Sequence, residues 1–137
     1  MRRKMGIDYG EVRIGVAFSD LLGIIATGYE TYVRKGLDAD LKHLNDLIVS
    51  QQVDKIIMGL PLNMDGTEGD RAKATREFGD KLSEFSNTEI EYLDERLTSV
   101  TAEEILIEAG MRREKRKEVI DKLSATLILQ DYLDRKH

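Results

Sequence analysis

The sequence predicts one α/β domain of three layers over residues 1–137, built on a mixed five-stranded sheet. Three observations lead to this prediction. The chain has 137 residues, which is the size of one ordinary domain. Apolar residues alternate at period two through much of the first 33 residues, as they do in strands. Beyond residue 37, helical periods alternate with two short apolar runs, the pattern of strand–helix–strand crossovers.

The first half of the sheet is predicted to be antiparallel. Residues 4–9 and 12–18 are two strand-like runs separated by Gly10 and Glu11, a spacing typical of a hairpin. A third strand between residues 24 and 33 completes a meander, because its apolar and polar residues again alternate at period two.

The second half is predicted to contain two parallel strands, joined to the rest by helical crossovers. The strands lie at residues 55–60 and 90–93. Helices are expected at residues 37–52 and from about 118 to 135. A third helix begins after Gly69 and carries Ala74, Phe78, Leu82 and Phe85 on one face. A fourth helix contains Ala102 and Leu106 and ends before Gly110. The last helix is apolar around so much of its circumference that we expect it to be buried against the sheet.

The composition excludes several kinds of chemistry. The chain has no cysteine, which rules out disulfides, thiolate metal sites and cysteine nucleophiles. Its two histidines, His43 and His137, are expected to be solvated and without a catalytic role, so a histidine-dependent triad is not expected. No stretch approaches 18 apolar residues and no signal-peptide core is present, so we expect a cytoplasmic protein without a membrane partner.

The charge is mildly acidic overall but unevenly distributed. The 21 basic and 26 acidic residues give a net charge of −5, which by itself does not favour a nucleic-acid partner. One segment is nevertheless strongly basic, and it consists of Arg112, Arg113, Glu114, Lys115, Arg116 and Lys117. Because this run stands directly before an acidic residue in an apolar helix, we interpret it as a phosphate-binding flap that becomes ordered with substrate.

Three acidic positions are candidates for chemistry. Asp8 ends the first strand, Asp94 and Glu95 end the last, and Asp121 borders the most apolar helix. Each has a structural alternative: closing a hairpin turn, a charged strand end before a helix cap, or an acid favoured by a helix dipole. Together they match the needs of a magnesium-dependent nuclease, in which several carboxylates hold hard cations and no histidine or cysteine is required.

A loop over residues 59–70 could bind phosphate, because it follows a buried strand and precedes a helix. Asn63, Gly66 and Arg71 are its candidate substrate-binding residues. The loop lacks the lysine of a P-loop and does not fit the EF-hand pattern, and a plain surface turn is the alternative.

Several short motifs, in this order, resemble the YqgF family, a bacterial group in the ribonuclease H-like superfamily related to the RuvC resolvases. The motifs are Gly6-Ile7-Asp8-Tyr9-Gly10, Arg13-Ile14-Gly15-Val16-Ala17, Gly59-Leu60-Pro61, Asp65-Gly66-Thr67, Asp94-Glu95-Arg96-Leu97-Thr98, and Asp121 with Ala125-Thr126-Leu127-Ile128-Leu129-Gln130. They extend from residue 6 to about residue 132, which is nearly the whole chain.

The resemblance implies a ribonuclease H-like fold with strand order 3-2-1-4-5. It also implies that Asp8, Glu95 and Asp121 bind two Mg²⁺ or Mn²⁺ ions and catalyse phosphodiester hydrolysis, with Asp94 as the alternative to Glu95. Arg13, Arg96 and Thr98 join the substrate-binding candidates. Strand 5 lies about 10 Å from strand 1, a distance that a glutamate reaching inward can span through the metal ions.

The family is associated with 5′-end processing of pre-16S ribosomal RNA, which makes that RNA the expected substrate and the ribosome a possible partner. Three alternatives stay open: a Holliday-junction resolvase acting on branched DNA, a non-catalytic RNA-binding factor in ribosome biogenesis or transcription, and an actin-like phosphate-binding protein. The sequence does not distinguish a monomer from a homodimer, although a resolvase that cuts two strands symmetrically needs a two-fold dimer.

Overall fold

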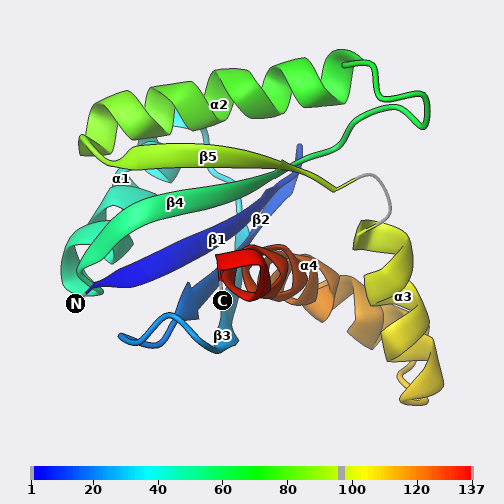
Figure 1. The fold of residues 1–137 in the computed structure, drawn as a ribbon. Coiled ribbons are helices and arrows are strands. Elements are labelled where there is room, and N and C mark those ends of the chain that lie inside the picture. The colour runs from blue at the N-terminus through cyan, green and yellow to red at the C-terminus, as the bar shows by residue number, and fades with distance from the viewer. Residues whose placement is uncertain (1, 96–97, 137) are drawn as a thin grey trace.

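The computed structural model describes residues 2–95 and 98–136, in which one five-stranded sheet is covered by helices on both faces (Figure 1). The strands are β1 (Arg3–Tyr9), β2 (Arg13–Ser19), β3 (Ala26–Val33), β4 (Val53–Leu60) and β5 (Glu89–Asp94). The helices are α1 (Leu37–Ser50), α2 (Asp70–Ser86), α3 (Thr98–Glu108) and α4 (Arg113–Lys136).

The sheet has the predicted order β3-β2-β1-β4-β5. Strand β2 pairs antiparallel with β1 and β3, and a short turn and a longer loop, residues 20–25, connect these three strands. Strand β4 pairs parallel with β1 and β5. Helix α1 connects β3 to β4, and α2 connects β4 to β5. The meander followed by crossovers is therefore confirmed.

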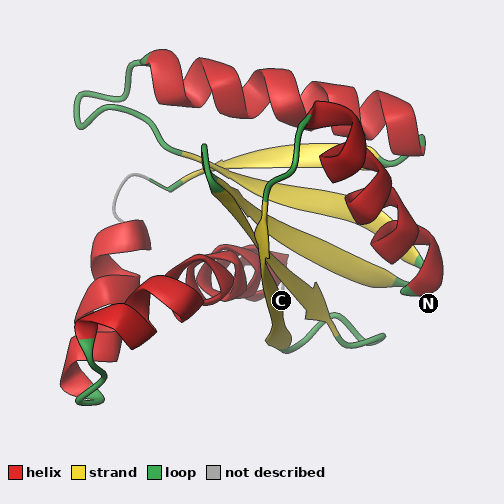
Figure 2. Ribbon diagram, turned by 180° about the vertical axis from the view of Figure 1, so that it is seen from behind, coloured by secondary structure: helices red, strands yellow, loops and turns green. Residues whose placement is uncertain are grey.

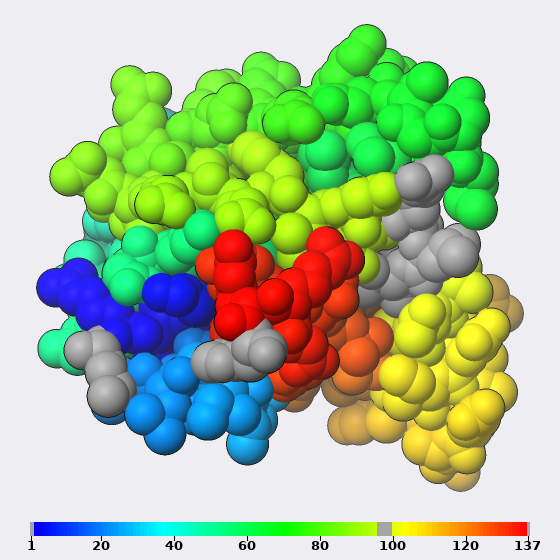
Figure 3. Space-filling model, viewed as in Figure 1, coloured from blue at the N-terminus to red at the C-terminus, as the bar shows by residue number. Residues whose placement is uncertain are grey.

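Helices α1 and α2 cover one face of the sheet, and α4 runs across the other (Figures 1 and 2). Each face has its own apolar core. The core under α1 and α2 contains Met5, Ile7, Leu44, Ile56, Met58, Phe78 and Leu82. The core under α4 contains Ala17, Ile57, Leu93, Ala125, Ile128, Leu129 and Tyr132. Figure 3 shows α4 lying across the sheet and α3 standing out at one corner of the molecule.

Glycines line the sheet where α4 crosses it. A Cβ atom on Gly15 would lie 1.9 Å from the carbonyl oxygen of Asp121, and one on Gly6 would lie 2.8 Å from the carbonyl oxygen of Ala125. Gly28 and Gly59, on β3 and β4, similarly face side chains of α4. Four neighbouring strands thus present no side chain at these points, and the backbone of α4 packs directly on β1 and β2.

The last helix begins earlier than the sequence predicted. It starts at Arg113 rather than at about residue 118, so the expectation that residues 112–117 form a flap is wrong. Gly110 has a positive φ of 75° and ends α3, and the amide of Arg116 then donates to the carbonyl of Arg112 at 2.9 Å. Arginine, lysine and glutamate are good helix formers, so the basic run forms the first turns of α4.

Two further expectations need correction. Phe85 is 52% exposed and Ala74 is exposed, since α2 buries the face of Ala72, Thr75, Phe78, Gly79 and Leu82 instead. His43 is not a solvated residue: its ring stacks on that of Tyr32 with centroids 4.1 Å apart, and its Nε2 contacts the Glu30 carboxylate.

We predict that Gly15→Ala lowers the free energy of unfolding by about 3 kcal/mol, because backbone rather than a movable side chain occupies the space of the new Cβ. Urea unfolding measures this change. The control is Gly23→Ala, which meets no atom within 4 Å and only forces alanine to a φ of 72°, at a cost of about 1 kcal/mol. Equal losses in the two variants would contradict the packing argument.

Candidate active site

Asp8 and Asp121 come together at one end of the sheet although 112 residues separate them in the sequence. Asp8 pairs with Gly15 across β1 and β2, and Gly15 lies against the backbone of Asp121. Directly opposed residues of an antiparallel pair point to the same face, so the Asp8 side chain points toward α4. The site therefore combines a strand-end carboxylate with one from the helix that covers it.

The electrostatics reflect this proximity. The pKa of Asp8 is raised to about 7, chiefly by burial and in addition by the charge of Asp121, while the charge of Arg71 acts to lower it. Burial also raises the pKa of Asp121, against the lowering effect of Arg13. A buried carboxylate whose ionisation is disfavoured by a neighbouring carboxylate is suited to sharing a proton or a cation with that neighbour.

Glu95 reaches toward the same region from the neighbouring strands. It follows β5, two residues after Leu93, which packs in the core under α4. Its amide donates to the carbonyl of Leu60 at 3.2 Å, its Oε1 is buried, and its Cγ lies 3.4 Å from where a Cβ on Gly59 would be. The missing side chain at Gly59 thus leaves space for Glu95 to lean across β4 toward β1.

Within residues 2–95 and 98–136, no group of three acidic or histidine side chains is close enough together to hold a metal ion. The charge of Asp121 acts on Asp8, and Glu95 extends over β4 on the same face. Asp94, the alternative third ligand, is the last residue of β5 and is exposed. Alternation along a strand places Asp94 on the opposite side from Glu95, so Glu95 is the better-placed residue.

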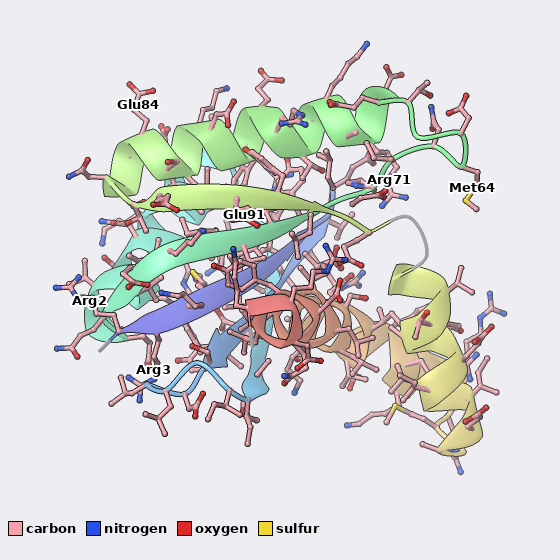
Figure 4. The ribbon with its side chains drawn as sticks, in the orientation of Figure 1. Arg2, Arg3, Met64, Arg71, Glu84 and Glu91 are labelled. Carbon is pink, nitrogen blue, oxygen red and sulfur yellow. The ribbon has the colours of Figure 1, made fainter. Side chains whose placement is uncertain are left out.

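A surface groove carries the arginines of the site. Asp121 lines it together with Arg71, Arg13 and the turn residues Gly10, Glu11 and Val12. Figure 4 shows Arg71 below the start of α2, at the end of the sheet. A second hollow continues from the same turn along α2 to Ala74 and Thr75. Two cations thus stand beside the acidic pair, in a groove open to solvent.

The loop between β4 and α2 lies at the same end of the sheet (Figures 1 and 2). Asn63 is occupied in shaping this loop: its Nδ2 donates to Thr67 Oγ1 at 3.0 Å, and its amide donates to the Thr67 carbonyl at 2.9 Å. Gly66 has a φ of 89°, which favours glycine in the turn. The structure places neither residue beside Asp8.

The basic residues at the start of α4 divide into two groups. Arg112, Arg113, Lys115 and Lys117 are exposed. Arg116 instead bonds the Glu103 carboxylate at 3.0 Å and the Met111 carbonyl at 2.9 Å, which ties α4 to α3. Arg96 lies outside the described residues, as does the side chain of Thr98, although Thr98 begins α3.

Sequence reasoning missed the glycines that seat α4 and the groove formed by the β1–β2 turn. The signal for the glycines was present: Gly6 and Gly15 each occur at an inward position of a strand, where a missing side chain marks a close approach.

Among the described helices, none has the length and apolar character needed to cross a membrane.

Comparison with protein families and relatives gives a consistent result. The family model RuvX, described as "Holliday junction resolvase", matches residues 2–135. A relative from Syntrophomonas wolfei is 51% identical over 132 residues, covering 96% of this chain and 94% of its own length. One from Streptococcus thermophilus is 48% identical over 136 residues, covering 97% of this chain and 98% of its own length. Both carry the name "Putative pre-16S rRNA nuclease".

Solved structures share the fold at low sequence identity. RuvC from T. thermophilus, in complex with a Holliday junction substrate, aligns with 99% of this chain and 96% of its own, with a TM-score of 0.60 and 10% identity. The fowlpox virus resolvase, in complex with Holliday junction DNA, aligns over 98% of both chains with the same TM-score and identity. The chain therefore has the fold of these RuvC-like resolvases.

The raised pKa of Asp8 predicts a pH-dependent stability. Because Asp8 binds its proton more tightly folded than unfolded, stability falls as the pH rises from about 4 to about 7. In EDTA, Asp8→Asn should therefore be more stable than wild type above pH 7, by about 4 kcal/mol, and equal to it below pH 4. Thermal unfolding across this range measures the difference.

Asp20→Asn provides a control of opposite sign. The amides of Ile24 and Ile25 donate to the Asp20 carboxylate and hold its pKa below the usual value, so the charged form is favoured in the folded protein. This variant should be less stable than wild type at pH 7, with the difference vanishing in acid. A stability of Asp8→Asn that follows wild type at every pH would contradict the burial of Asp8.

Proposed function

Because this chain belongs to the RuvX family, we propose that it is a nuclease, a hydrolase of phosphodiester bonds, acting in 5′-end processing of pre-16S ribosomal RNA. The observation that carries the proposal is that the buried carboxylate of Asp8 lies within reach of the charge of Asp121, which lines a groove together with Arg13 and Arg71. The names of the relatives at 51% and 48% identity supply the substrate. A single domain of residues 1–137 would carry this activity in the cytoplasm, in association with ribosome precursors.

Asp8, Asp121 and Glu95 are the residues that would hold Mg²⁺ or Mn²⁺. Their chemistry fits such an ion, because carboxylate oxygens are its preferred ligands and a divalent cation relieves the repulsion that raises the pKa of Asp8. When bound, the metal supplies Lewis-acid stabilisation of the charge that develops on the phosphoryl group. Two such ions would require all three carboxylates to converge.

Arg13 and Arg71 are proposed to bind the phosphates that flank the scissile bond. Their guanidinium groups can donate paired hydrogen bonds to phosphate oxygens. Both arginines act electrostatically on the acidic pair, since Arg71 lowers the pKa of Asp8 and Arg13 that of Asp121. A phosphate beside both arginines would therefore lie next to the carboxylates.

The exposed basic residues of α4 would extend this contact along the nucleic acid. Arg113 and Lys117 precede Asp121 by two turns and one turn of the helix, so all three follow one ridge. Arg112 and Lys115 add charge nearby, while we assign Arg116 to the contact between α3 and α4. Asn63, Gly66, Arg96 and Thr98 remain proposed substrate contacts.

A second candidate function is resolution of branched DNA. The description of the family model and the alignment with RuvC favour it. A resolvase must cut two symmetric strands and so needs a two-fold dimer, whereas RNA processing can proceed with a monomer. A third outcome, RNA binding without cleavage, would reassign the acidic pair to another role.

The test is cleavage of a precursor RNA containing the 5′ extension of 16S ribosomal RNA and of a four-way DNA junction, each with Mg²⁺, Mn²⁺ or EDTA. We expect metal-dependent cutting of the RNA and at least tenfold slower cutting of the junction, about the effect of losing one good contact. Asp8→Asn should abolish cutting and retain RNA binding, because it removes a ligand charge and keeps the shape.

Asp54→Asn is the matched control. Asp54 is an exposed β4 aspartate that pairs with Lys4 Nζ at 2.6 Å, at the opposite end of the sheet. The Asp54→Asn variant should therefore cut the RNA as fast as wild type. Faster cutting of the junction would establish the resolvase instead. RNA that is bound but not cut would overturn the nuclease proposal.

A further inference from the structure

We propose that Arg34 is a positioning residue that fixes the turn between β1 and β2 and, through that turn, places Arg13 in the groove. Arg34 follows β3 and does not line the groove that contains Asp121. Its contacts are nevertheless concentrated on the turn between β1 and β2, which does line the groove. The inference rests on the proposed function for its catalytic consequence, but its structural part can be tested separately.

One guanidinium group gathers three oxygens of the turn. Arg34 Nη1 lies 2.7 Å from the hydroxyl of Tyr9, 3.3 Å from the carbonyl of Gly10 and 3.4 Å from the carbonyl of Glu11. The amide of Arg34 also donates to the carbonyl of Val12 at 2.9 Å. Each residue from Tyr9 to Val12 is therefore held by Arg34, up to the residue before Arg13.

A buried acid anchors the guanidinium from the other side. Arg34 Nε donates to Asp40 Oδ2 at 2.9 Å, and Asp40, in the first turn of α1, has no solvent exposure. Asp40 also accepts bonds from the Tyr32 hydroxyl and the Lys35 amide, each at 2.9 Å. These bonds outweigh burial and hold the pKa of Asp40 below its usual value, so it remains charged and fixed.

Two aromatic rings pack against the guanidinium group of Arg34. The guanidinium carbon lies 4.8 Å from the ring centroid of Tyr9 and 5.7 Å from that of Phe78, and these two rings stack on each other. The Arg34 side chain is 19% exposed. A planar group that bonds carbonyls at its edge and meets rings with its face cannot be replaced by a lysine ammonium.

The consequence for the groove is geometric. Arg13 begins β2 directly after the turn, and a Cβ on Gly10 would lie 2.7 Å from the Arg13 carbonyl, so the turn is tight. A tight turn whose carbonyls are all bonded has few alternative conformations. Arg34 thus fixes the starting point of Arg13, which acts on Asp121 across the groove.

The first experiment is amide hydrogen exchange of residues 9–14 in metal-free protein, which needs no catalytic activity. Arg34→Lys should speed exchange in this segment about tenfold, since several bonds to the turn are lost together, and leave β4 unchanged. Arg135→Lys is the matched control, because Arg135 is an exposed arginine paired with Asp131 at 2.6 Å far from the turn. Unchanged exchange in Arg34→Lys would overturn the inference.

The second experiment is a double-mutant cycle on RNA cleavage with Arg34→Lys and Arg13→Gln. Each variant should lower kcat/KM about tenfold, and the pair together little more than either one, because Arg34 acts through Arg13. Losses that multiply would show that Arg34 does not act through Arg13.

Two further comparisons distinguish a variant that fails to fold from a failure of the proposed function. If Arg34→Lys does not fold, Tyr9→Phe removes only the hydroxyl contact and should still raise exchange at residues 9–14; no rise would overturn the inference. If the wild type cuts no RNA, the proposed function fails, while the exchange experiment still decides whether Arg34 holds the turn.

Discussion

Helix α4 lies on the sheet in direct backbone contact, and the geometry of the candidate site depends on that contact. Gly6, Gly15 and Gly59 present no side chains to the helix, so it approaches closely enough for the Asp121 carbonyl to meet β2. A side chain at any of these positions would lift the helix or shift it along the sheet. Asp121 would then move away from Asp8.

The same contact creates an electrostatic cost. It buries both carboxylates, which raises the pKa of each, and the charge of Asp121 raises the pKa of Asp8 as well. A folded protein tolerates such a pair where function requires it, since the apolar cores on both faces of the sheet supply the stability. The arginines of the groove moderate the repulsion and leave the pair available to a cation or a phosphate. On this account, the site stores unfavourable charge that a ligand relieves.

Much of the fold could be predicted because it depends on local periodicity. The hairpin, the crossovers and the strand order follow from alternating and helical patterns together with the family motifs. The start of α4 at Arg113 could not be read from an apolar pattern, because its first turns are charged and exposed. His43 was misjudged for a related reason: its partners, Tyr32 and Glu30, come from β3 and meet it only in the folded chain.

The site was predictable as a set of residue types and not as an arrangement. Asp8, Glu95 and Asp121 stand out as acids that end or border apolar segments, yet the approach of Asp121 to Asp8 depends on glycines whose role appears only in three dimensions. The part played by Gly59 is an example, since the space that it leaves lets Glu95, which follows β5, lean over β4. Arg34 was likewise invisible, because its four turn contacts come from residues more than 20 positions away.

Mn²⁺ binding, monitored by electron paramagnetic resonance, tests most directly whether Asp8 and Asp121 form one shared site. It is measured for wild type, Asp8→Asn, Asp121→Asn and the double variant. If the two carboxylates form one site, either single substitution should weaken binding at least tenfold, with little further loss in the double variant. Binding that survives both single substitutions, or losses that simply multiply, would show that α4 does not bring the two acids into a shared site.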